Sequence, residues 1–182
     1  MKVIDRVSAY RAKSLLSDGR EHAMEILVED KFAKSLLTEI LRQRFPELIS
    51  SIGIHPVGDA TAVRQLTEYL IDAGHRAIAI RDADQGENKS TKLFKFPGTL
   101  PPEKEVFLTS EVQNELGSKY NIDVREILSV ADLDHHKYSE YLSLKAHCPK
   151  EVLENQAIVE YIRTKGEGFF AELVSIIGSE LH

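Results

Sequence analysis

The chain has a single cysteine, no tryptophan and only two methionines among its 182 residues. Because Cys148 stands alone, no disulfide can form within the chain, and this scarcity is typical of proteins that fold in a reducing compartment. No stretch approaches the roughly 18 consecutive apolar residues that a membrane-spanning helix needs. The first residues also lack the apolar core of a secretory signal. We therefore expect a cytoplasmic protein with no membrane segment.

Positive charge is also scarce. The sequence has 29 acidic against 23 basic residues, a formal net charge of -6. A protein that grips nucleic acid by itself usually has a basic face. Here such a face would have to be local, or be supplied by a partner or by a second subunit of a homo-oligomer. The length suits one domain, with room for a helical appendage.

Hydrophobic periodicity divides the chain into two halves. In the first half, short apolar segments alternate with amphipathic stretches, whereas no strand is expected beyond residue 96. The expected strands cover 23–28, 52–57, 76–81 and 93–96. The expected helices cover 2–17, 31–44, 60–73, 103–116, 123–131, 136–146, 149–164 and 167–181.

This order of elements predicts the fold class. With right-handed crossovers, alternating strands and helices form an α/β fold in which a small Rossmann-like parallel sheet is sandwiched by helices. The remaining helices form a C-terminal helical extension. The predicted organisation is an N-terminal helix or connector over 1–20, an α/β core over 21–116 and a helical subdomain over 117–182.

Two of the apolar strands end in carboxylates. Glu29 follows the first expected strand, and Asp82 and Asp84 follow the third. Because the carboxyl ends of parallel strands meet at one edge of a sheet, these side chains should lie close together. Three carboxylates at that edge would bind a hard divalent cation such as Mg2+, which points to phosphoryl chemistry.

Each of these carboxylates also has an ordinary structural interpretation. A glutamate after a strand often caps the next helix, and aspartates frequently stabilise turns. Asp30 is expected to cap the helix of 31–44. Only the combination of acids at the ends of two apolar strands favours a functional site.

The same residues resemble the Toprim domain, whose signature is a glutamate after the first strand and an Asp-x-Asp after the third. Here these are Glu29 and the segment Asp82-Ala83-Asp84, and the resemblance covers about residues 23–96. Topoisomerases, bacterial primases, small RNA-maturing nucleases and OLD-family (overcoming lysogenization defect) endonucleases share this domain. The resemblance implies that Glu29, Asp82 and Asp84 are catalytic metal ligands.

Two later segments resemble the OLD branch. Residues 96–104 are similar to its Leu-Pro-Gly…Pro-Glu segment, and residues 134–138 resemble its Asp-x-His-aromatic stretch. The resemblance implies a DNA endonuclease or nickase that uses Mg2+ or Mn2+ and acts with an ATPase, often in phage defence. The Gly-x-x-x-x-Gly-Lys-Ser/Thr motif does not occur, so an ATPase would be another chain or domain.

The sequence departs from the family pattern at two positions. Asp30 stands where a glycine is usual, and Ala33 stands where OLD-type domains often have a second acid. Glu103 could supply another metal-binding carboxylate, or it could only favour the dipole of the helix it begins. The alternative function is therefore a non-catalytic Toprim-fold binding or regulatory subunit. A receiver-like domain fits less well because the strand count falls short.

Basic and imidazole side chains supply the remaining candidates. Lys89 and Lys92, with Lys95 at the same three-residue spacing, could bind nucleic-acid phosphates, although a solvated loop is the simpler interpretation. His135 and His136 could assist proton transfer or make structural hydrogen bonds. The dispersed histidines and lone cysteine lack the usual zinc-ligand spacing, so no zinc site is expected.

Overall fold

A computed structural model of the protein describes residues 22–130 and 134–181. The helix expected over 2–17 lies outside these residues. The strands are β1 (Met24–Val28), β2 (Ile52–Pro56), β3 (Ala77–Arg81) and β4 (Leu93–Lys95). The α-helices are α2 (Lys31–Arg44), α3 (Ala60–Asp72), α4 (Pro102–Phe107), α5 (Ser110–Tyr120), α6 (Val124–Ser129), α7 (Tyr138–Ala146) and α8 (Lys150–Leu181). Short 3-10 helices are η1 (Ile49–Ser51), η2 (Lys89–Thr91) and η3 (His135–Lys137).

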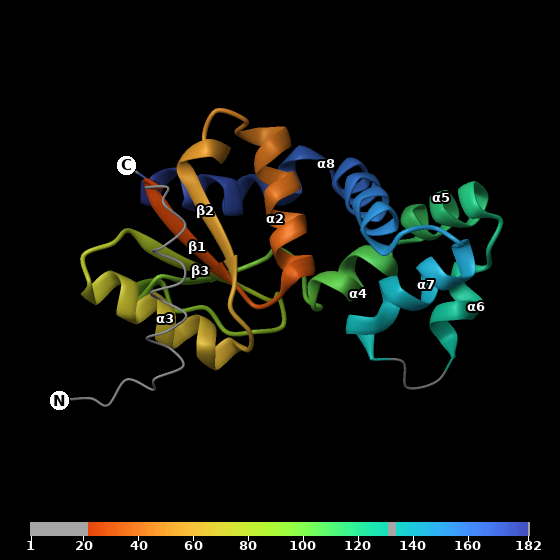
Figure 1. The fold of residues 1–182 in the computed structure, drawn as a ribbon. Coiled ribbons are helices and arrows are strands. Elements are labelled where there is room, and N and C mark those ends of the chain that lie inside the picture. Colours follow the sequence, from red (N-terminus) through yellow and green to blue (C-terminus); the bar gives the residue numbers. More distant parts are fainter. Residues whose placement is uncertain (1–21, 131–133, 182) are drawn as a thin grey trace.

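The four strands form one parallel sheet in the order β2-β1-β3-β4 (Figure 1). This confirms the predicted α/β fold with helices on both sides of a parallel sheet. Strand β1 is central, and Glu25 pairs with Gly53 of β2 and with Ala77 of β3. No helix among the described residues is long and apolar enough to cross a membrane.

Alternate residues of each strand bury themselves on opposite faces of the sheet. Ile26 and Ile78 join the core on the side of α2 and α8, whereas Leu27 and Ala79 pack with α3 on the other side (Figure 1). Burial on both faces explains why these strands read as unbroken apolar runs. The central strands therefore have apolar residues buried on both faces of the sheet.

Helices α2 and α3, which lie on opposite faces of the sheet, both begin at an aspartate cap. The Asp30 carboxylate accepts a hydrogen bond from the backbone N–H of Ala33, which confirms the predicted cap of α2. The Asp59 carboxylate does the same for α3 with the N–H groups of Thr61 and Ala62. Gly74 follows α3 at a φ of 85°, a conformation that glycine adopts without strain.

Beyond β4 the described residues are helical, as expected, but one of the expected helices is divided. The single helix expected over 103–116 is two helices, because Thr109 is extended and begins α5 after α4 has ended at Phe107. The helices expected over 149–164 and 167–181 are confirmed: they follow one another in α8 and are separated by a break at Gly166. The backbone there has φ 72° and ψ -179°, a region open in practice to glycine alone.

Because of that break, the two halves of α8 pack on different parts of the protein. The first half lies against α5 and α7, and the second half lies behind the sheet (Figure 1). Phe170, Leu173 and Ile177 share one hydrophobic cluster with Ile26 and Ile78 of the strands. The chain therefore passes through the helical part (α4 to α7 and the first half of α8) and returns to the α/β part.

Candidate metal centre at the carboxyl edge of the sheet

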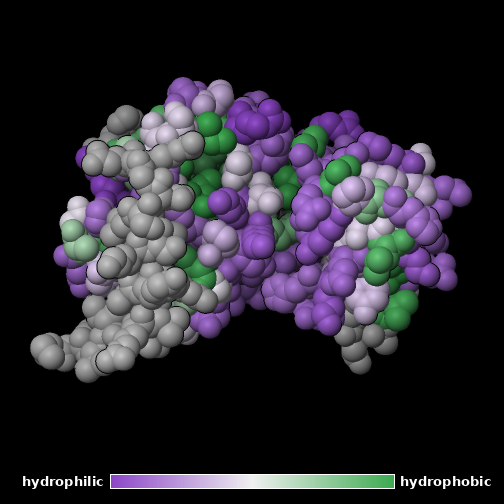
Figure 2. Space-filling view, in the orientation of Figure 1, coloured by the Kyte–Doolittle hydropathy of each residue, from purple (hydrophilic) through white to green (hydrophobic). Residues whose placement is uncertain are grey.

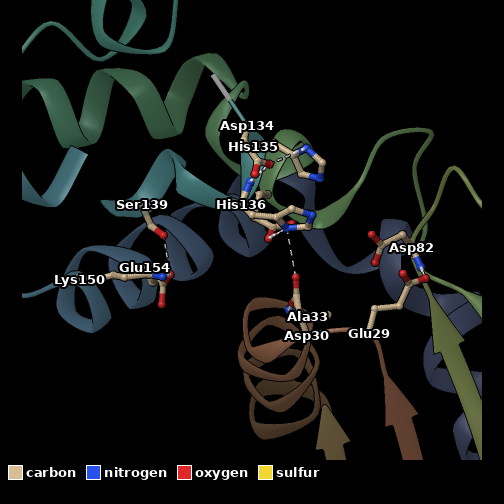
Figure 3. A network of polar contacts seen from close by, with 11 residues as sticks. Glu29, Asp30, Ala33, Asp82, Asp134, His135, His136, Ser139, Lys150 and Glu154 are labelled. Atoms are coloured by element: carbon tan, nitrogen blue, oxygen red, sulfur yellow. Dashed lines mark hydrogen bonds and ion pairs between the residues drawn. The ribbon is translucent and has the colours of Figure 1, made fainter. Parts of the chain in front are cut away.

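Glu29 and Asp82 lie side by side where β1 and β3 end (Figure 3). The Asp82 backbone N–H lies 3.5 Å from Glu29 Oε1. Asp82 is almost buried, at 8% exposure. The parallel pairing of β1 with β3 thus brings together two of the three carboxylates on which the sequence-based hypothesis rests.

Asp84 lies close by but is more exposed. Its carboxylate accepts a hydrogen bond from the side chain of Gln85 at 3.2 Å. The Arg81 guanidinium donates to Gln85 Oε1 and to the Gly86 carbonyl, so it holds the loop that follows the aspartates. Asp84 therefore lies at the solvent-exposed rim of the site, where its charge acts on Asp82.

Glu103, in the first turn of α4, lines the same cavity as Glu29 and Asp82 but reaches it from the helical part of the chain. Its side chain is buried, and Oε1 lies 3.1 Å from His136 Nδ1. The same His136 nitrogen lies 3.6 Å from Asp30 Oδ2, and Figure 3 shows Asp30 pointing from the start of α2 toward His136. Glu103 Oε2 is buried without a hydrogen-bond partner in the described structure. An unpartnered buried oxygen of this kind is costly unless a cation or donor compensates it.

These side chains line one cavity of about 730 Å³ at the junction of the α/β part and the helical part. Its polar walls include Glu29, Asp30, Asp82, Glu103 and His136. Hydrophilic residues predominate on the surface in the lower part of that junction (Figure 2). The site is thus assembled from both halves of the chain, because His136 and Glu103 reach it from helical segments.

The carboxylates raise one another's pKa values. Burial raises the pKa of Asp82 to about 7, and the charges of Glu29, Asp30 and Asp84 add to this effect. Burial and the charge of Asp30 raise the pKa of Glu103 to about 8. Burial also raises the pKa of Glu29, although the Asp82 N–H and Arg81 oppose the change. The cluster carries more negative charge than its surroundings offset, which is the condition that a bound cation would relieve.

The two adjacent histidines respond in opposite directions. Burial lowers the pKa of His135, and the neighbouring His136 adds to that effect. For His136 burial also acts to lower the pKa, but the hydrogen bond and charge of Glu103 outweigh it and raise the pKa. His136 is therefore the residue of this pair that can hold a proton beside the carboxylates.

The lysines predicted to contact nucleic acid lie away from this cavity lining. Lys92 Nζ forms an ion pair with Glu180 of α8 at 2.7 Å, and Lys89 lies in η2, which precedes β4. Lys95 Nζ donates to the Ala83 carbonyl at 3.3 Å and is the lysine of the three that meets the aspartate loop. Two other lysines, Lys31 and Lys150, line the cavity.

Sequence reasoning did not single out Lys31 or Lys150. Lys31 directly follows Glu29 and Asp30, so its position at the first turn of α2 could have been noticed. Nothing in the sequence indicated Lys150, which reaches the cavity from the start of α8. Its Nζ lies 3.5 Å from Glu154 Oε1.

Comparison of the chain with protein-family models, curated proteins and solved structures gives no significant match.

Proposed function

We propose that this protein is a divalent-metal-dependent DNA endonuclease or nickase of Toprim type. The observation that carries the proposal is that Glu29, Asp82 and Glu103 line one cavity, where Glu103 Oε2 is buried without a hydrogen-bond partner. Hard divalent cations bind such oxygen ligands, so Mg2+ or Mn2+ fits the donor set. The resemblance to the OLD branch adds the expectation of an ATPase partner, a role in phage defence and a cytoplasmic location.

The residues of the cavity divide into three roles. Glu29, Asp82 and Asp84, with Glu103, would hold the cation. When bound, that cation would activate water and neutralise charge that develops on the phosphate. His136 holds a proton between Glu103 and Asp30 and could deliver it to a leaving oxygen. Lys31 and Lys150 carry positive charge into the same cavity, where a DNA phosphate would need it.

One observation favours the second candidate, a non-catalytic binding or regulatory subunit. Position 33 is a buried alanine whose backbone N–H is already bonded to Asp30, so no acid is available there for a second cation. A domain with one weakened cation site could serve an assembly without cleaving DNA.

Plasmid nicking tests the enzymatic proposal. The wild-type chain should relax supercoiled DNA with Mg2+ or Mn2+, and Asp82→Asn should lower the rate by at least ~100-fold, since it removes charge where the transition state needs a cation. Asp72→Asn, at the exposed end of α3, is the matched control and should cleave at the wild-type rate. Equal rates for Asp82→Asn and wild type would rule the assignment out.

Calorimetric titration separates the two candidates. Saturable Mn2+ binding that Glu29→Gln abolishes, together with nicking, supports the enzyme. No binding at millimolar Mn2+ supports the regulatory subunit.

A further inference from the structure

A second group of metal-ligand side chains lies on the sheet, apart from the carboxylate cavity. It consists of His22, just before β1, Glu25 in β1 and His55 in β2. Glu25 Oε1 lies 3.2 Å from His22 Nδ1, and Glu25 Oε2 lies 2.6 Å from His55 Nε2. One potential ligand atom from each residue falls within 4.8 Å of the other two.

The strand register explains why these side chains meet. Glu25 pairs with Gly53, and His55 is two residues further along β2, so it points to the same face of the sheet. This is the α3 side, because Leu27, two residues from Glu25, packs there. The site thus differs from the cavity at the carboxyl edge both in its face and in its position along β1.

Gly53 makes the convergence possible. A Cβ atom at this position would lie 2.0 Å from Glu25 Oε2, 2.5 Å from His22 Nδ1 and 2.6 Å from His55 Nε2. No side chain other than hydrogen leaves room for three such atoms above the backbone. Gly53 therefore lies directly beneath the cluster, as its floor. The ligand atoms of His22, Glu25 and His55 face one another over it.

The cluster is partly shielded from water and electrostatically prepared for a cation. The three side chains are 11–15% exposed. Burial alone would raise the pKa of Glu25, but the hydrogen bonds and charges of His55 and His22 outweigh it and lower the pKa. The carboxylate is thus ionised and placed between two imidazole nitrogens.

We propose that His22, Glu25 and His55 bind a transition-metal ion, with Zn2+ the best fit. Two imidazole nitrogens and one carboxylate oxygen form a known zinc donor set, with a fourth position left for water. Imidazole ligands favour Zn2+ over Mg2+, whose preferred ligands are oxygens. The hydrogen bonds of the metal-free cluster hold the three side chains near one another, so little reorganisation is needed on binding. The metal would join β2 to β1 and to the residue that leads into β1.

Metal analysis of the full-length chain tests this proposal without reference to nuclease activity. Metal-free protein, titrated with Zn2+, should bind a single tightly held ion, and Co2+ in its place should give the visible absorption of a four-coordinate site. His22→Gln and His55→Gln should each weaken Zn2+ binding by roughly 100-fold or more. His22 lies outside the strands, so its substitution should leave the fold intact.

Three further variants locate the ion. Gly53→Ala keeps every ligand but fills the floor, so it should also abolish tight binding. His147→Asn changes an exposed histidine at the end of α7, where the left-handed backbone suits asparagine, and should bind Zn2+ like wild type. Asp82→Asn should retain the ion as well. If His22→Gln and His55→Gln bind Zn2+ as tightly as wild type, or if Asp82→Asn alone loses it, the proposal is wrong.

Discussion

Strand β1 has a glutamate near each end, and the two side chains meet opposite surroundings. Glu25, in the strand, lies between two imidazoles, which lower its pKa although burial acts against them. Glu29, just past the strand, lies half-buried among carboxylates in the cavity, and its pKa is raised. Burial acts to raise the pKa of both glutamates, so the neighbouring side chains decide whether each pKa is raised or lowered.

The difference shows how one strand can present two kinds of metal chemistry. At the Glu29 end the donors are carboxylate oxygens with an excess of negative charge, which suits Mg2+ or Mn2+. At the Glu25 end the donors are two nitrogens and a carboxylate, which suits Zn2+. The neighbours of Glu25 come from β2 and from the segment before β1, whereas those of Glu29 come from the end of β3 and from the starts of α2 and α4 and from η3. In the two proposed sites, the metal preference would follow from the segments that pack around each glutamate rather than from the glutamates themselves.

The largest effect on the nicking rate should come from exchanging Glu29 for glutamine, and the same exchange at Glu25 is its matched comparison. We expect Glu29→Gln to lower the metal-dependent nicking rate by at least ~100-fold, because it removes charge from the cation site. Glu25→Gln should leave that rate within about threefold of wild type, a change of less than about 0.7 kcal/mol in barrier. Plasmid nicking assays with Mn2+ measure both. A comparable loss in the two variants would mean that the two ends do not act separately.

The pH dependence of stability should distinguish the ends by its sign. The pKa of Asp82, about 7, exceeds the normal value of 3.8, so the folded protein keeps a proton that the unfolded chain has released. The free energy of unfolding of metal-free protein should therefore fall between about pH 4 and pH 7, by about 1–3 kcal/mol. Glu25 acts oppositely, since its lowered pKa adds stability above 4.5 that is lost as the pH falls.

Urea unfolding in the presence of a chelator, at several pH values, measures these slopes. Asp82→Asn should match wild type at or below about pH 4, where Asp82 is protonated in both states, and be more stable than wild type at about pH 8. Addition of Mn2+ should remove the same slope from the wild-type protein. An unchanged slope in Asp82→Asn would contradict the electrostatic account of the cavity.

The smallest effect should come from single lysines. Lys31 lines the cavity beside Glu29, whereas Lys92 precedes β4 and is paired with Glu180. If Lys31 contacts a phosphate, Lys31→Ala should reduce the salt dependence of DNA affinity by about one ion, and Lys92→Ala should leave it unchanged. DNA binding measured at several salt concentrations tests this. The reverse result would favour Lys92, as the lysine spacing in the sequence predicted.

Much of the α/β part could be predicted from local sequence. The apolar runs before Glu29 and Asp82 identified the central strands, and the cap at Asp30 placed the start of α2 within a residue. Parallel pairing then implied that Glu29 and Asp82 would meet. These predictions succeeded because each depends on short-range periodicity and on one general rule about parallel sheets.

The remaining features depend on contacts that periodicity does not encode. His22 and His55 are far apart in the sequence, so they looked dispersed. The register of β1 with β2, which brings both to Glu25 above Gly53, cannot be told from the sequence. The approach of His136 to Glu103 required the packing of η3 on α4. The second half of α8 returns to the sheet because the backbone breaks at Gly166. The sequence alone does not distinguish such a break from an ordinary helix end.

That return has a consequence for how the protein acquires its structure. The strands are complete at Lys95, but the face bearing Ile26 and Ile78 is covered in part by Phe170, Leu173 and Ile177, which come much later in the chain. Such pairings of distant segments slow folding and leave apolar surface open in partly folded chains. We therefore expect the core of the α/β part to be completed only when the last helical segment docks on this face.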